Sequence, residues 1–168
     1  MRHSVDHIQR AVKAGGQLLH NTDQNHSRDP LVIHYDLRER GGSDERDIDA
    51  ARDRIWKVEE ELLVLDNFLN KHSSEPSTID SRLAQPLHAC FMLLGNSEQE
   101  YPLSSTLARE LGFAVHHAIH HMAMVRVIVT APSISTESPL FGWSDEDVPA
   151  DFGRAPSTIN HDHAHAEQ

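Results

Sequence analysis

Residues 44–71 form the stretch of sequence that most narrows the choice of fold. From Ser43 or Asp44 to about Lys71, apolar side chains recur every three or four positions, which is the spacing of one face of an α-helix. Acidic residues at its start suit the positive end of a helix dipole. The apolar positions are Ile48, Ala51, Ile55, Val58, Leu62, Leu65 and Leu69. The pattern predicts a long amphipathic helix in a largely helical protein.

Two further stretches have helical spacing. Residues 2–20 begin a helix that reaches Gly15 and Gly16 and can continue for one more turn. Residues 104–130 begin at a serine cap and end before Pro132. The segment "PLHACFMLL" (86–94) can be a short strand or an extended crossover. We therefore expect one domain over residues 1–168, with an irregular tail over 131–168 whose last eight or so residues are disordered.

Composition excludes several classes of protein. The net charge of −11 argues against a nucleic-acid partner, because binding to phosphates depends on clustered Lys and Arg. No apolar run approaches the ~18 residues of a membrane span, and the N-terminus lacks the apolar core of a signal peptide. We therefore expect a cytoplasmic protein with no membrane partner. Cys90 is the single cysteine, so any metal site is expected to use histidines and carboxylates.

Fourteen histidines are present, and four of them lie in the helix predicted over 104–130. His117 and His121 lie at the edge of its apolar stripe, and His116 and His120 form a second pair rotated by about 100°. Two imidazoles one turn apart can chelate one ion, although the same spacing also occurs at ordinary helix–core boundaries. The first helix carries a similar pair, His3 and His7.

Four motifs resemble, in order and spacing, those of an uncharacterised bacterial branch of the DinB-like (YfiT-like) metalloenzymes. They are "MRHSVDHIQRAV", "YDLRERGG", "SSTLARELGFAVHHAIHHMAMV" and "VPADFGRAPST". The resemblance implies an all-α fold, an up-down-down-up four-helix bundle with an irregular C-terminal wrap. It also implies a divalent metal held by three histidines, which map to His3, His117 and His121.

This resemblance implies further site residues and partners. His7 would be the substitute for His3, and His120 the runner-up on the last helix. The metal would be zinc or nickel, which both suit neutral imidazoles. Glu110, on nearly the same face as His117, is the candidate for a catalytic or ligand-orienting carboxylate, and Asp6 is the next candidate. The open coordination positions would accept a small-molecule substrate such as a thiol.

The chain departs from the family pattern at its N-terminus, where Met1 stands directly before the "RH" motif. One bundle helix is therefore expected to be missing, through a misassigned start or a true truncation, and the exposed face is expected to form a homodimer. Three functions stay open: a metal-dependent hydrolase or thiol S-transferase, a non-catalytic metal-binding or stress-related bundle, and an oligomer-forming interaction protein.

Overall fold

A computed structural model describes residues 2–21, 31–37, 41–71, 76–95, 98–130 and 145–166. By its internal contacts the chain divides into two compact units, one over residues 2–114 and one that begins at Val115. Helix α4 (Leu107–Thr130) contributes to both units. No helix in the described ranges combines the length and apolar character that crossing a membrane requires.

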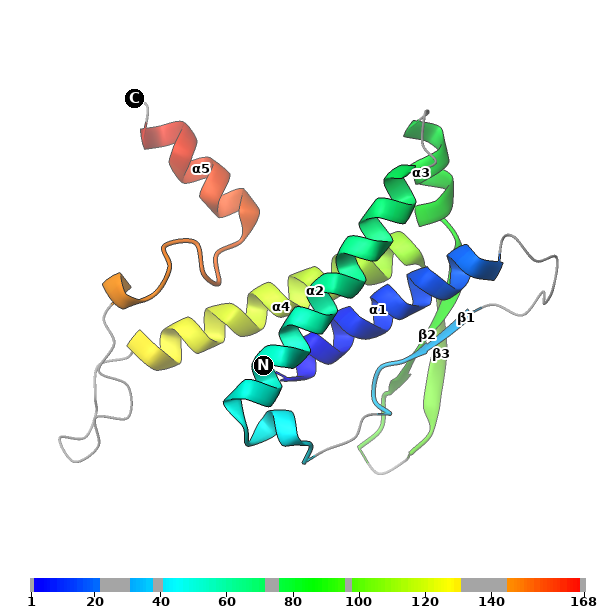
Figure 1. Ribbon diagram of the computed structural model, residues 1–168, viewed down its shortest axis with the longest axis horizontal. Helices are drawn as coiled ribbons and strands as arrows, with labels where there is room; N and C mark the ends of the chain where they lie inside the picture. The colour runs from blue at the N-terminus through cyan, green and yellow to red at the C-terminus, as the bar shows by residue number, and fades with distance from the viewer. Residues whose placement is uncertain are drawn as a thin grey trace. The chain divides into compact units, whose positions relative to one another are not determined.

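The first unit joins helices to a small sheet (Figure 1). Its helices are α1 (Arg2–Asn21), a 3₁₀ turn (Ser43–Glu45), α2 (Ile48–Lys71) and α3 (Pro76–Leu83). Its strands are β1 (Leu31–His34), β2 (Pro86–Met92) and β3 (Glu100–Thr106), and the first turns of α4 follow β3 directly. The strand order is β1-β2-β3, with β1 parallel and β3 antiparallel to β2. The sheet is therefore mixed.

Helix α1 packs against α2 on one side and β1 on the other. Val12 and Leu65 form the buried contact between the two helices. A Cβ on Gly15 would lie 3.0 Å from the Leu65 side chain, so this glycine permits close approach rather than ending the helix. Arg54 of α2 adds ion pairs to Asp6 and, at 3.1 Å, to Asp44. Helix α1 continues through both glycines to Asn21, so the alternative of one more turn was the correct one.

The main core lies between the sheet and the helices. Every second residue of β2 faces it, because side chains alternate across a strand. Its buried members are Ala14, Ile33, Tyr35, Leu87, Ala89 and Leu107. The apolar stripe of α2 is only partly used: Val58 and Leu65 are buried, whereas Ile55 and Ile48 are exposed. Periodicity thus located the helix correctly but overstated its buried face.

The predicted all-α, four-helix-bundle fold is wrong. The three long helices lie near the predicted ranges, but they share the chain with two short helices, α3 and α5 (Pro156–Ala166), and with the three-stranded sheet. The segment 86–94 contains β2, so the strand alternative was the correct one for it. Strand β1 escaped prediction because its partner β2 lies in a segment far away in sequence. Strand β3 follows β2 after a short connection, but its residues from Ser104 on were predicted to begin the next helix.

The second unit contains the rest of α4, a 3₁₀ turn (Asp145–Asp147) and α5. Arg126 of α4 donates hydrogen bonds to the carbonyl oxygens of Ala150 and Phe152, at 3.0 and 3.3 Å. These bonds tie the turn at 145–153 to the helix. The expectation of an irregular tail over 131–168 is therefore wrong for residues 156–166, which form α5, while 131–144 and the last two residues lie outside the described part.

Replacing Gly153 with alanine is expected to detach this turn from α4. Gly153 has a φ of +74°, and an added Cβ would lie 2.6 Å from the backbone nitrogen of Ala123, which cannot move aside. Gly41 is the matched control, because its φ is +77° but the nearest atom to an added Cβ is 3.5 Å away. The left-handed conformation alone costs ~1 to 2 kcal/mol.

Hydrogen exchange would measure the difference. In the Gly153→Ala variant, amides of residues 145–166 should exchange at least tenfold faster, which corresponds to about 1.4 kcal/mol. The Gly41→Ala variant should leave exchange in that segment unchanged. Equal protection in both variants would contradict the close packing of Gly153 on α4.

Candidate functional site

The first unit contains a fully buried carboxylate, that of Glu110 in the first turn of α4. Tyr35 donates its hydroxyl proton to Oε2 at 2.6 Å, and Ser105 donates to Oε1 at 2.5 Å. The guanidinium of Arg109 lies 2.6 Å from Oε1. Helix α4, the segment after β1 and strand β3 therefore meet at one buried carboxylate, which three donors stabilise.

Tyr35 is held in its protonated form. Burial, together with the hydrogen bond to Glu110 and the negative charge of that residue, raises the pKa of Tyr35 far above its usual value. The phenol therefore acts as a hydrogen-bond donor throughout the physiological pH range.

An aromatic cluster surrounds this phenol. The ring of His7 stacks on Tyr35 with 4.6 Å between centroids, and Phe91 stacks on Tyr35 at 5.0 Å. Phe113 meets Tyr35 edge-on at 5.8 Å and lies beneath the guanidinium of Arg109. His7, predicted as a substitute metal ligand, is buried in this cluster.

A cavity of about 290 Å³ lies beside the carboxylate network. It is lined by Ala89, Leu103, Ser104, Ser105, Thr106 and Arg109. Ser105 and Arg109 thus contact both the cavity and Glu110. This arrangement combines an apolar wall with a few polar groups, as small ligand sites do.

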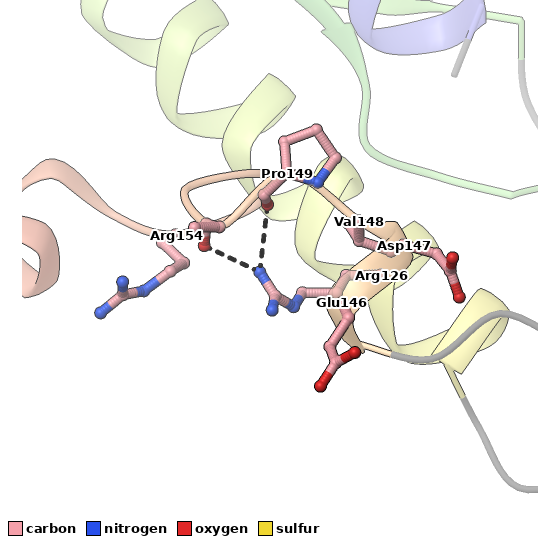
Figure 2. A pocket seen from close by; sticks show the side chains of 7 residues that line it. Arg126, Glu146, Asp147, Val148, Pro149 and Arg154 are labelled. Atoms are coloured by element: carbon pink, nitrogen blue, oxygen red, sulfur yellow. Dashed lines mark hydrogen bonds between the residues drawn. The ribbon is translucent and has the colours of Figure 1, made fainter.

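A second hollow, of about 860 Å³, lies in the second unit (Figure 2). Figure 2 shows Arg126 pointing toward the 145–154 turn, where it donates to the carbonyls of Pro149 and Ala150. The full lining is Arg126, Glu146, Asp147, Val148, Pro149, Ala150 and Arg154. Because its hydrogen bonds go to backbone carbonyls of the turn, we infer that Arg126 stabilises the fold of this unit rather than binding a ligand.

The second unit also contains the histidine pair of α4. The Nε2 atoms of His117 and His121 lie 3.1 Å apart, and both side chains are partly buried, whereas His116 and His120 are exposed. Burial, and then the charge of neighbouring groups that include His120, lowers the pKa of both His117 and His121. Both rings are therefore neutral at physiological pH, the form that binds metals.

The other predicted site residues are His3, His7, Asp6 and Glu110. The side chain of His3 lies outside the described residues, and His7 belongs to the first unit. Asp6 pairs with Arg54, and Glu110 binds Tyr35, Ser105 and Arg109. The three-histidine ligand set, and a role for Glu110 beside it, stay predictions.

Three possible metal-ligating residues that were not predicted from the sequence lie close together on the sheet. His34, Cys90 and Glu100 come from three different strands, and one possible ligand atom from each lies within 4.8 Å of the others. Motif spacing could not have found this group, because His34 is brought to Cys90 by the pairing of β1 with β2, which lie far apart in sequence.

The fold and the site thus describe a mixed helix–sheet protein with a buried carboxylate beside a small cavity. Over 159 residues the chain is 29% identical to FK506-binding protein 5 of Rhizopus delemar. The alignment covers 94% of this chain but 35% of that protein, so the chain spans about a third of the relative's length. No family model matches the chain, and no solved structure matches it either.

The assignment to the DinB-like (YfiT-like) family, which rested on four sequence motifs, is therefore wrong. The similarity to an FK506-binding protein and the mixed sheet contradict a four-helix-bundle metalloenzyme. The hydrolase and thiol-transferase functions inferred from that resemblance, and the stress-related bundle or interaction protein given as alternatives, are withdrawn with it.

Proposed function

We propose that this chain is a ligand-binding domain of the FK506-binding protein type, which binds FK506 and prolyl peptides. The observation that carries the proposal is the similarity to FK506-binding protein 5 over 94% of the chain. The activity proposed with it is acceleration of cis–trans isomerisation at X–Pro bonds, which takes tens to hundreds of seconds without a catalyst.

The cavity beside Arg109 is the proposed ligand site. Its volume of about 290 Å³ lies just below the usual range for ligand pockets and suits one ring, such as that of a prolyl residue. Ala89 and Leu103 offer apolar contact, while Ser104 and the Arg109 guanidinium can donate hydrogen bonds to a carbonyl.

A titration of FK506 into the full chain, followed by calorimetry, tests the proposal. We expect saturable binding of one molecule per chain, and a faster cis–trans exchange of a proline-containing peptide that FK506 suppresses. Absence of both from the folded chain would mean that the aligned third of the relative does not contain its FK506 site.

A pair of tryptophan variants locates the ligand. Ser104→Trp places a large side chain at the cavity lining and should weaken FK506 binding at least tenfold. Ser157→Trp, at an exposed position of α5, is the control and should leave the affinity unchanged. Unchanged binding by both variants would remove this cavity from the proposal.

A second proposal concerns the histidine pair: His117 and His121 bind one divalent cation, zinc or nickel. Two nitrogens each ~2.0 to 2.1 Å from one ion, at ligand angles of about 90 to 110°, lie about 2.9 to 3.4 Å apart. The Nε2 atoms are 3.1 Å apart, so one ion can bind with little movement of the rings. In the absence of metal the same distance is an N–H···N hydrogen bond whose direction depends on the tautomers.

The remaining predictions concern location and partners. We infer a cytoplasmic setting, where Cys90 stays reduced. A small-molecule partner and a homodimer stay predictions. The absence of a nucleic-acid partner also stays a prediction, which the net charge of −11 supports.

A further inference from the structure

We propose that His34, Cys90 and Glu100 form a zinc site on the outer face of the sheet. The site is independent of the FK506 proposal and of the α4 histidine pair. The argument begins with strand register. His34 is the partner of Cys90 in the parallel β1–β2 pair, and Cys90 is the partner of Pro102 in the antiparallel β2–β3 pair. Glu100 lies two residues from Pro102 and therefore on the same face.

This face is the one turned away from the main core. Ile33, Tyr35 and Ala89 belong to the core cluster, and the side chains next to them in sequence point the opposite way. His34 and Cys90 are such neighbours. Three strands thus direct an imidazole, a thiol and a carboxylate to one place at one end of the sheet.

The distances are close to those of a metal site. One possible ligand atom from each residue lies within 4.8 Å of the other two, and His34 Nδ1 lies 2.5 Å from Glu100 Oε2. Ligands of one tetrahedral zinc ion, bound at ~2.0 to 2.3 Å, lie about 3.3 to 3.8 Å apart. Zinc binding therefore requires His34 and Glu100 to separate by roughly 1 Å, which rotation of the half-exposed imidazole can provide.

The remaining polar atoms also suit a cation. Glu100 Oε1 is buried and has no hydrogen-bond partner among the described residues, so the carboxylate keeps an acceptor that is not used. Its side chain is 11% exposed, whereas that of His34 is 48% exposed and opens the group to solvent. An ion can enter from that side, and water can take the fourth coordination position.

The donor set selects the kind of metal. A thiolate and an imidazole favour zinc and similar transition metals over magnesium or calcium, which prefer oxygen ligands. Binding releases the thiol proton of Cys90, and the metal then neutralises the thiolate and the carboxylate together.

Cobalt(II) is the probe that tests the site, because its bond to a thiolate gives a near-ultraviolet charge-transfer band that imidazole and carboxylate ligands do not give. We expect the band, under a phosphine reductant, to saturate at the amplitude of one thiolate-bound Co²⁺ per full chain and to disappear on addition of excess Zn²⁺. The Cys90→Ser variant should lack the band. The nearly isosteric Glu100→Gln variant should bind cobalt at least tenfold more weakly.

Two controls separate this site from others. His88 lies two residues before Cys90 on the same strand, and the His88→Ala variant should keep the full band. The double variant His117→Ala/His121→Ala should also keep it, because that pair contains no sulfur. Absence of the band at saturating cobalt in the folded chain, or its persistence in Cys90→Ser, would overturn the proposal.

Discussion

Replacing Glu110 with alanine should lower the free energy of unfolding by about 3 kcal/mol, because Tyr35 and Ser105 lose the acceptor that both use. Each hydrogen bond to a charged group contributes about 1.5 to 3 kcal/mol, and a buried hydroxyl without an acceptor adds a penalty of its own. Tyr35 is 1% exposed, so water cannot replace the lost carboxylate. Urea unfolding followed by circular dichroism would measure the loss.

Two further variants separate the parts of this network. Tyr35→Phe keeps the ring stacking with His7 and Phe91 and removes only the hydroxyl, so it should cost about 1.5 to 3 kcal/mol. Arg109→Gln should cost less than about 1 kcal/mol, because the Arg109 side chain is 54% exposed and water screens its ion pair. A larger loss from Arg109→Gln than from Tyr35→Phe would contradict this view of the site.

Replacing either His117 or His121 with alanine should lower the affinity for zinc or nickel at least tenfold, because one imidazole cannot chelate. The measurement is a calorimetric titration of the full chain in which His161, His163 and His165 of α5 are replaced by glutamine and Cys90 by serine, so that these residues do not compete for the metal. His116→Ala is the matched control and should bind as the parent does, since His116 is exposed on another side of α4. Equal loss from all three alanine variants would contradict the assignment.

The pH dependence of the metal-free chain provides a second test of the pair. Burial and neighbouring charged groups lower the pKa of His117 and His121 in the folded state below the ordinary value of about 6.5. The unfolded chain therefore binds these protons first as the pH falls. Stability from this source is present above about pH 6.5 and is lost as the pH falls through the lowered pKa values. Glutamine at both positions should flatten the profile below about pH 6.5.

The positions of the long helices followed from local pattern. Apolar spacing of three and four residues located α1, α2 and α4 to within a few residues, because a helix forms its hydrogen bonds within its own segment. The same pattern placed His117 and His121 one turn apart. It could not tell which apolar residues a partner would cover, and Ile48 and Ile55 remain exposed on α2.

The sheet and the sites built on it depended on contacts between distant segments. Strand β1 gains its hydrogen bonds from β2, and its four residues carry no pattern that identifies this partner. Glu110 was predicted as a site residue from its place on the helix. Its hydrogen-bond donors, Tyr35 and Ser105, come from the segment after β1 and from β3, which the helical pattern did not indicate. His34, Cys90 and Glu100 meet for the same reason. A helix is determined largely by residues close together in sequence, whereas strand pairing and the burial of polar groups depend on how the whole chain packs.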